Sequence, residues 1–124
     1  MAKGAEAQIQ RGIIAWLRCV MPDALVHHGK NEINKRGAAI AIELANAKRN
    51  GAVTGWPDLI VLPFANVGPV FFEVKAPRGY PSPAQKSVHE QLTRLGYPVA
   101  VVRSVDDVRA SLVEWGIGFR EVTK

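Results

Sequence analysis

Three charged residues lie inside a stretch that otherwise has the composition of buried β-strands. The segment GWPDLIVLPFANVGPVFFEVKAP, residues 55–77, places Asp58, Glu73 and Lys75 among apolar side chains. A charge in a buried strand costs free energy unless it is paired or coordinated. Glu73 and Lys75 are two positions apart, so in a strand their side chains leave on the same face. The pattern indicates a functional site or, on the simpler interpretation, an ion pair on an edge strand.

These three residues have the chemistry of a metal-dependent hydrolase. If the two strand-like halves of the segment form an antiparallel hairpin, Asp58 at the start of one lies beside Glu73 at the end of the other. Two carboxylates and the carbonyl oxygen of Val74 form an all-oxygen site that suits Mg²⁺ or Mn²⁺. Such an ion would polarise a phosphodiester and activate water, while Lys75 orients that water and stabilises the transition state. The alternative for Asp58 is a turn residue that follows a proline.

Two further candidates depend on where helices would place them. Glu6 falls at the centre of the apolar stripe of a helix predicted for residues 5–20, where a solvated charge is out of place. Alternatively, it lies in an exposed first turn, where a negative charge favours the helix dipole. Gln85 ends the sequence SPAQ, a capping-box pattern, so it either caps a helix or contacts the attacking water or a phosphate. For metal binding we expect Asp58, Glu73, Val74 and Glu6.

Other polar and aromatic residues border these motifs. His27, His28, Asn31 and Glu32 cluster before a basic loop, although histidines near a strand end are more often structural or solvated. Trp56 and Tyr80 either stack on nucleic-acid bases or pack, and packing is the favoured interpretation for Trp56. Several basic residues would flank the site and contact phosphates, or else are solvated surface charges: Lys30, Lys35, Arg36, Lys48, Arg49, Arg78, Lys86 and Arg94.

The elements that would position these residues alternate between helix and strand. Apolar periodicity and Pro/Gly boundaries predict a helix at 5–20, a strand at 24–28, a loop at 29–37, a helix at 38–50 and strands at 57–63 and 69–77. A helix from Ser82-Pro83 to Gly96 follows, with Leu95 in its apolar stripe, and then a buried strand at 98–102 and a helix from Ser104 to Gly116. A strand remains an alternative for residues 38–44. The order predicts an α/β fold around a small mixed sheet, with Trp16 and Trp115 in its core.

Length, charge and cysteine content limit the possible functions. The chain has 124 residues, which fits a single domain over 1–124. The 16 Lys and Arg against 11 Asp and Glu give a net charge of +5, which favours polyanionic partners such as nucleic acid. One cysteine fits a reducing cytoplasm, and no CxxC or HxxxH spacing suggests zinc. We find no signal peptide, membrane-spanning run or Walker-type loop, and we expect a cytoplasmic protein.

The motifs GWPDLIVL, FFEVKAPRGYPSPAQ and LGYPVAVVRSVDDV together resemble the virus-type replication-repair nuclease (VRR-NUC) domain of the PD-(D/E)XK superfamily. The resemblance implies a restriction-endonuclease-like αβββαβ core. It also implies that Asp58 and Glu73 ligate a divalent metal, that Lys75 handles the water, that Gln85 completes the site and that Glu6 is the acidic residue of the first helix.

The resemblance extends to function. Stand-alone relatives of this size are similar to Holliday-junction resolvases, which are dimeric nucleases that select DNA by its structure. We therefore expect a Mg²⁺- or Mn²⁺-dependent DNA endonuclease, a homodimer that cuts branched DNA. The alternative is a nucleic-acid-binding protein that keeps the fold without cleavage. A structural subunit in which the acidic residues form only an ion pair is a further alternative.

Overall fold

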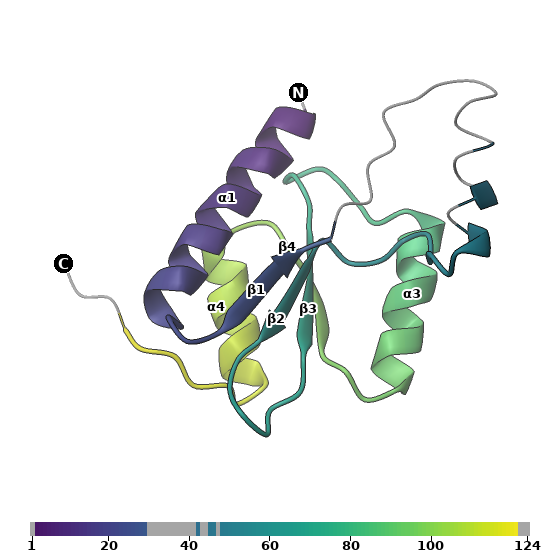
Figure 1. The fold of residues 1–124 in the computed structure, drawn as a ribbon. Coiled ribbons are helices and arrows are strands. Elements are labelled where there is room, and N and C mark those ends of the chain that lie inside the picture. The colour runs from purple at the N-terminus through teal and green to yellow at the C-terminus, as the bar shows by residue number, and fades with distance from the viewer. Residues whose placement is uncertain (1, 30–41, 43–44, 47, 122–124) are drawn as a thin grey trace.

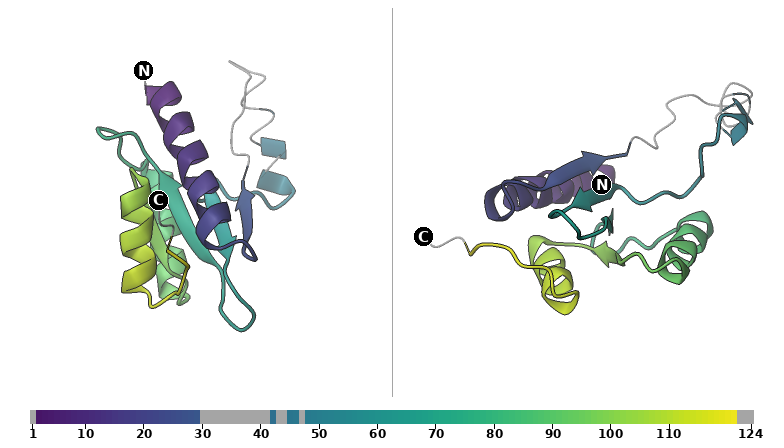
Figure 2. Two further views of the ribbon diagram at one scale, coloured as in Figure 1. Left: turned by 90° about the vertical axis from the view of Figure 1, so that its left-hand side faces the viewer. Right: turned by 60° about the horizontal axis from the view of Figure 1, so that its bottom comes forward.

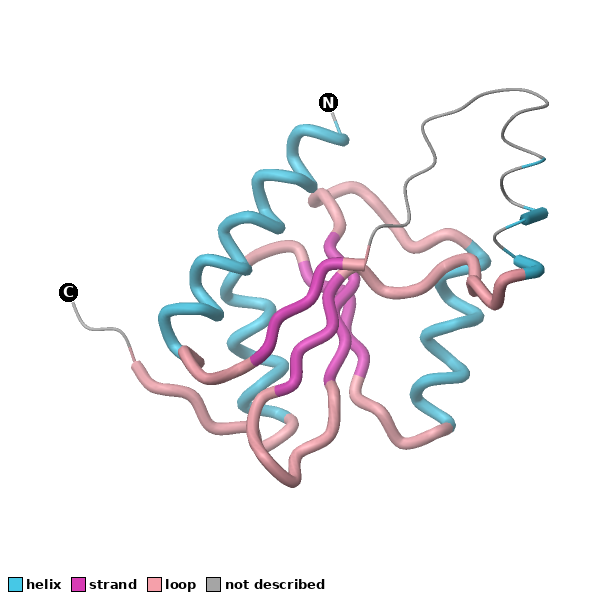
Figure 3. The backbone as a smooth tube through the Cα atoms, viewed as in Figure 1, coloured by secondary structure: helices cyan, strands magenta, loops and turns pink. Residues whose placement is uncertain are grey.

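The computed structural model describes residues 2–29, 42, 45–46 and 48–121. The predicted αβββαβ order is confirmed, and one more helix follows it (Figure 1, Figure 3). The elements are α1 (Ala2–Val20), β1 (Leu25–His28), β2 (Leu59–Leu62), β3 (Val70–Val74), α3 (Pro83–Arg94), β4 (Val99–Val102) and α4 (Val105–Glu114).

The four strands form one mixed sheet in the order β1-β2-β3-β4. β1, β2 and β3 are antiparallel neighbours, and Leu59 lies opposite Phe72 in the predicted hairpin. β4 joins β3 in parallel, because α3 carries the chain back to the starting edge, and Glu73 lies opposite Val101. β3 is therefore a central strand with a partner on each side.

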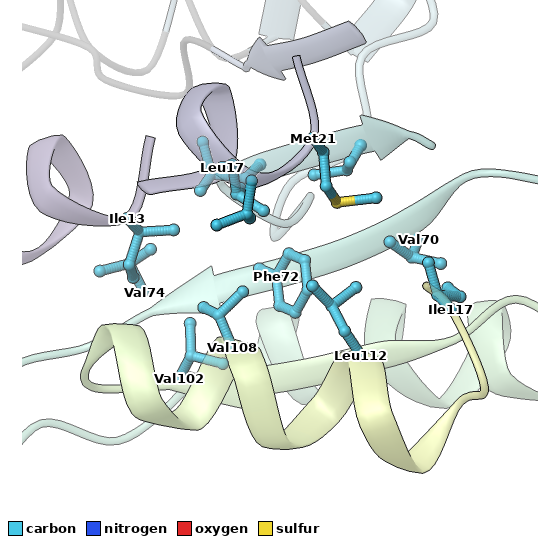
Figure 4. Packing of buried hydrophobic residues seen from close by; sticks show 13 residues of the cluster. Ile13, Leu17, Met21, Val70, Phe72, Val74, Val102, Val108, Leu112 and Ile117 are labelled. Carbon is cyan, nitrogen blue, oxygen red and sulfur yellow. The ribbon is translucent and has the colours of Figure 1, made fainter. Parts of the chain in front are cut away.

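Helices cover both faces of the sheet. Figure 2 shows α1 and α4 together on one side and α3 on the other. The larger core lies between the sheet and the helices α1 and α4, where Figure 4 shows Phe72 between Leu17 and Leu112. Phe72 also lies against Trp115, with ring centroids 5.5 Å apart. A smaller cluster of Phe71, Val88 and Leu92 joins α3 to the opposite face.

Local sequence signals explain where the helices begin and end. α3 starts at Ser82, whose hydroxyl accepts from the backbone N–H of Gln85, and Pro83 follows as the first helical residue. It ends before Gly96, which has a φ of +92° that only glycine adopts readily. α4 starts at Ser104 by the same kind of cap, from the N–H of Asp107. These starts agree with the sequence-based prediction.

Several predicted boundaries and burials were wrong. The two hairpin strands are shorter than predicted, since Pro57 and Lys75 lie outside them, and α1 begins before residue 5. Leu95 was predicted in the apolar stripe of α3 but is 72% exposed, because the helix ends at Arg94 and its side chain points away from the sheet. The strand at 98–102 was expected to be buried and is mostly half-buried, because β4 is the last strand of the described sheet.

The predicted loop at 29–37, from residue 30 on, and the strand alternative at 38–44, except residue 42, lie outside the described residues. Of the predicted helix at 38–50, the described positions 42, 45–46 and 48–49 are helical. No helix in the described part of the chain is long and apolar enough to span a membrane.

Candidate active site

Glu73 is the one charged side chain that is fully buried among the described residues. It projects from β3 toward α3, on the same face as Phe71, because side chains alternate along a strand. Its Oε2 accepts a hydrogen bond from Nε2 of Gln85 at 3.1 Å and lies 3.9 Å from Nζ of Lys75. Its Oε1 lies 3.3 Å from Nε2 of His89. Both carboxylate oxygens therefore have partners, which offsets the cost of burial.

Asp58 lies beside Glu73, as the hairpin geometry predicted. It precedes β2, and its Oδ2 accepts a hydrogen bond from the backbone N–H of Val74 at 2.8 Å. The carboxyl groups of Asp58 and Glu73 also share a hydrogen bond with each other. The turn interpretation for Asp58 therefore does not describe its contacts, which are with the end of the neighbouring strand.

The backbone of Val74 faces Asp58 as well. A strand residue directs its N–H and its C=O toward the same side of the strand. Since the Val74 N–H points to Asp58, the Val74 carbonyl also faces the β2 side of β3. The N–H of the next residue, Lys75, points the other way and donates to the carbonyl of Val102 at 3.0 Å.

Gln85 caps α3, which is one of the two functions that the sequence left open, and it also contacts the buried Glu73. Its Oε1 accepts from the backbone N–H of Ser82 at 2.8 Å, which completes the capping box. This bond fixes the orientation of the amide, so that Nε2 faces Glu73. The same side chain thus closes the first turn of α3 and holds the buried carboxylate. A contact with water or phosphate stays a prediction.

Gly55, the first residue of the Gly-x-Pro-Asp motif, explains how the Asp58 loop and α3 come together. It has a φ of +93°, and a Cβ at this position would lie 2.5 Å from the carbonyl group of Ala84 and 2.8 Å from the nitrogen of Gln85. Only glycine allows both the conformation and the approach. The loop that carries Asp58 therefore packs directly on the helical turn that carries Gln85.

Glu6 of α1 reaches the same end of the sheet. Its charge acts on Glu73, where it raises the pKa of that carboxyl group. Its Oε2 would lie 3.5 Å from a Cβ on Gly79, so the carboxyl group lies near the loop between β3 and α3. Glu6 is half-buried, and the interpretation as an exposed first-turn charge is wrong.

His89 is a site residue that the sequence reasoning missed. It lies one helical turn after Gln85, so the two side chains leave α3 on the same face. Burial lowers the pKa of His89, and the nearby Lys75 lowers it further, so the ring is held neutral. A neutral ring with its proton on Nε2 donates to Glu73. The i, i+4 spacing from Gln85 was the signal that could have revealed it.

The electrostatics of the acid pair are those of two carboxyl groups placed close together in a low-dielectric environment. Burial, and then the hydrogen bond and charge of Glu73, raise the pKa of Asp58 to about 7. Burial also raises the pKa of Glu73, while Asp58 and Lys75 act to lower it. Without a cation, the pair therefore retains a proton near neutral pH, since two adjacent buried charges repel.

The donor set fits a small divalent cation. Mg²⁺ prefers oxygen ligands and typically takes one or two carboxylates together with water and substrate phosphate. Asp58, just before β2, and Glu73 and the Val74 carbonyl, at the end of β3, provide such oxygens. The described residues contain no group of three or more His, Cys, Asp or Glu arranged to hold a metal ion, so a cage made of side chains alone is not present in them.

The remaining predicted residues lie at varied places. Trp56 packs edge-on against Phe71, with ring centroids 5.7 Å apart, as predicted. His27 and His28 are exposed on β1, whereas Asn31 and Glu32 lie outside the described residues, as do the predicted phosphate contacts Lys30, Lys35 and Arg36. The other five basic candidates are exposed: Lys48, Arg49, Arg78, Lys86 and Arg94.

Comparisons with known proteins agree with the motifs. The family model of the VRR-NUC domain matches residues 5–106, which include Glu6, Asp58, Glu73, Lys75 and Gln85. "Putative nuclease p44" of Acyrthosiphon pisum secondary endosymbiont phage 1 is 34% identical over 91 residues, which make up 73% of this chain and 90% of that protein.

Two solved structures share the fold. The first, named "VRR_NUC domain protein", has a TM-score of 0.67 at 24% identity and covers 90% of this chain and 87% of its own. The second, named "VRR_NUC domain", has a TM-score of 0.59 at 25% identity. The match covers 89% of this chain and 95% of the chain in that structure. The resemblance predicted from the motifs is confirmed, and the chain belongs to the VRR-NUC family of nuclease domains.

Proposed function

We propose that this nuclease-family chain is a DNA endonuclease that depends on Mg²⁺ or Mn²⁺ and hydrolyses phosphodiester bonds. The observation that carries the proposal is the acid pair of the half-buried Asp58, just before β2, and the buried Glu73, near the end of β3, with Lys75 beside it. Carboxyl groups that share a hydrogen bond, with raised pKa values, are unfavourable in a purely structural role. A divalent cation between them would relieve that repulsion.

The residues of the chain have distinct tasks in this proposal. Asp58, Glu73 and the Val74 carbonyl would hold the cation, which would supply a Lewis acid for the phosphate and make a bound water more acidic. Gln85 and His89 keep the Glu73 carboxylate in one orientation through Nε2 contacts at 3.1 and 3.3 Å. Lys75 orients the attacking water and stabilises negative charge on the phosphate as the leaving oxygen departs. Glu6 adds negative charge on the α1 side and strengthens cation binding.

The DNA would approach the edge at which β3 ends and α3 begins. Arg78 and Lys86 are exposed in and just after the connection between these two elements. Together with the net charge of +5, they provide a positive surface beside the acid pair. Phosphate contacts from these side chains would bring a backbone phosphate to the cation.

We further propose that the protein is a homodimer that selects branched DNA. A two-fold symmetric dimer presents two equivalent sites, which matches the symmetry of a four-way junction and would give paired cuts. Support for this part is the resemblance to dimeric resolvases, which is an analogy at the level of the family. Light scattering of the purified protein would measure the mass of the assembly and test the dimer directly.

Cleavage of a labelled DNA panel tests the proposed activity. The panel holds linear duplex, single strand, flap and four-way junction, each with Mg²⁺, Mn²⁺ or EDTA. We expect the wild-type protein to cut only with metal, and Glu73→Ala and Lys75→Ala to bind DNA without cutting it. Glu114→Ala removes an exposed acid on α4 and is the matched control, which should retain full activity.

The outcomes separate the alternatives. Cleavage that persists in EDTA or in Glu73→Ala would contradict a metal mechanism at this site. If the wild-type protein binds every DNA but cuts none with either metal, the chain is a non-cleaving binder with a nuclease fold. Equal cleavage of linear duplex and junction would remove the selectivity for branches while leaving the nuclease activity in place.

A further inference from the structure

The loop of residues 76–82 connects the end of β3 to α3 and so joins Lys75 to the helix of Gln85. The N–H of Gly79 donates to the carbonyl of Ala76 at 2.9 Å, which closes a tight turn. The carbonyl of Gly79 accepts from the guanidinium of Arg103 at 2.8 Å. Arg103 is itself fixed, because its backbone N–H donates to Oδ2 of Asp107 at 2.8 Å. The turn is therefore held from within and from the start of α4.

Tyr80 is the most exposed large apolar side chain among the described residues, at 76%. The guanidinium carbon of Arg103 lies over its ring, 5.4 Å from the centroid. One face of the ring thus contacts a cation, which attracts the negative π-surface, and the large exposure leaves the other face open to solvent. An aromatic ring that is fixed on one face and open on the other has the form of a stacking surface.

The ring lies next to the candidate active site. Its neighbour Gly79 lies near Glu6, since a Cβ on this glycine would be 3.5 Å from Oε2 of Glu6, and the charge of Glu6 acts on Glu73. The same loop begins directly after Lys75 and carries the exposed Arg78. A nucleotide whose phosphate lies at the acid pair would therefore have its base or its neighbour's base within reach of this loop.

We propose that Tyr80, supported by Arg103, is a stacking platform for an unpaired nucleobase adjacent to the cleaved phosphate. The proposal deepens the proposed function and rests on it for the position of that phosphate. Every base has a π-face, so such a platform tolerates any sequence. In duplex DNA the base faces are covered by neighbouring pairs and only the edges are accessible. Tyr80 therefore selects sites where a strand leaves the duplex, such as flaps, forks and junctions.

The loop and the ring of Tyr80 are held in one arrangement by Arg103. Arg103 holds both the backbone of the loop and the ring of Tyr80, so little conformational freedom is lost when a base stacks. Arg78, which is exposed in the same loop, supplies a contact for a flanking phosphate. The platform would give a single protomer selectivity for duplex boundaries, independently of any dimer symmetry.

The test compares affinities for a forked duplex and a blunt duplex of the same sequence, measured by fluorescence anisotropy in EDTA, where no cleavage is expected. The variants are Tyr80→Ala, Tyr80→Phe, which keeps the ring, and Leu95→Ala. Leu95 is 72% exposed at the other end of α3 and is the matched control for loss of an exposed apolar side chain. A second measurement places 5-iododeoxyuridine at each of the first three unpaired positions and maps the photo-cross-link by mass spectrometry.

We expect Tyr80→Ala to bind the fork roughly 5- to 100-fold more weakly, the range for loss of one stacked base. Its affinity for blunt duplex should change less than about two-fold, since no base face is open there. Tyr80→Phe and Leu95→Ala should behave like the wild type. The cross-link should map to Tyr80 from one unpaired position.

Equal loss of affinity for both DNAs, or no loss for either, would overturn the platform, as would a cross-link that maps elsewhere. Because affinity is measured without cleavage, the two proposals fail separately. A protein that never cuts but loses fork binding in Tyr80→Ala would contradict the nuclease proposal and keep the platform. A protein that cuts forks equally well with and without the Tyr80 ring would contradict the platform and support the nuclease proposal.

Discussion

Phe72 and Glu73 are neighbours on β3 and are both fully buried, yet they lie on opposite faces of the sheet and are held in different ways. Phe72 packs among apolar side chains of α1 and α4, so its burial is favourable without any directed contact. Glu73 faces α3, where burial is unfavourable for its charge and is offset by contacts with Gln85, His89 and Lys75. One face of the strand stabilises the fold, and the other holds a buried carboxylate whose desolvation neighbouring side chains must offset.

Substitution of Glu73 by Gln tests whether the α3-facing side of β3 is needed for cleavage and not for stability. We expect cleavage to fall by about 10³-fold or more, because a neutral amide is a poor ligand for a divalent cation. The free energy of unfolding should stay the same or increase, since a buried charge is replaced by a neutral group of the same shape. Urea denaturation and cleavage rates on the same preparation check both. A large loss of stability would show that Glu73 supports the fold.

Substitution of Phe72 by Ala tests whether the opposite side of β3 is needed for stability and not for cleavage. We expect the loss of about 3–5 kcal/mol of stability from the lost transfer free energy and the cavity left between the layers. Any protein that remains folded should retain its cleavage rate, because Phe72 points away from the acid pair. Denaturation followed by cleavage assays at low temperature measures this. A folded but inactive variant would contradict the separation of the two faces.

His89 offers a finer test of how Glu73 is held. We expect His89→Ala to reduce cleavage about 10- to 100-fold, as is typical for partners that orient a metal ligand, with a matching increase in the Mn²⁺ concentration needed for half-maximal rate. His89→Asn, whose amide can donate to Glu73, should recover part of the loss. The shift in metal requirement is the diagnostic readout, since a purely structural role would lower the rate without it.

The acid pair predicts a smaller effect on stability with pH. The folded protein holds a proton on Asp58 up to about pH 7, whereas the unfolded chain loses it near its ordinary pKa of 3.8. The unfolded state therefore binds fewer protons in this window, so the contribution of Asp58 to stability falls as pH rises and is lowest above about pH 7. In EDTA, the stability of Asp58→Asn relative to wild type should rise between about pH 4.5 and pH 8 by several degrees in Tm.

The comparison with Asp58→Asn also limits the contribution of His89 to the measured pH dependence of Tm. The lowered pKa of His89 has the opposite sign, since it weakens the fold when pH falls below the ordinary value of 6.5. Both proteins contain His89, so the effect of its burial cancels in their difference, and only the part that the Asp58 charge contributes to the pKa of His89 remains. Mn²⁺ at about pH 8 should raise the Tm of the wild type more than that of Asp58→Asn. A difference in Tm that stays flat with pH would contradict the buried acid pair.

The sequence predicted the elements well where apolar period and caps were both present. α3 and α4 have Ser caps, apolar stripes and terminal glycines, and their starts were correct. The limits of the strands were less accurate, because the segment keeps a strand-like composition past Val74, the last residue of β3 in register with β4. The exposure of Leu95 depended on where the helix ended, which periodicity alone does not fix.

The site was predictable where one strand pairing controls the geometry. Two-residue spacing and the hairpin were enough to place Asp58 beside Glu73. His89 was missed because its role depends on which face of α3 meets the sheet, a tertiary property. The dual role of Gln85 and the contact of Gly55 with Ala84 likewise depend on a packing distance between segments that are far apart in the sequence.

The position of β3 between β2 and β4 has a consequence for the newly made chain. A ribosome releases the protein from its N-terminus, so Asp58 and Glu73 emerge well before residues 99–102 of β4, which complete the hydrogen bonding of β3. Parallel pairing across α3 requires closure of a long loop, which is a slow step in folding. The pairing that surrounds Glu73 on both sides of β3 can therefore form only after residues 99–102 have been synthesised. In refolding experiments, recovery of cleavage would report a late folding step that spectroscopic signals of helix formation would precede.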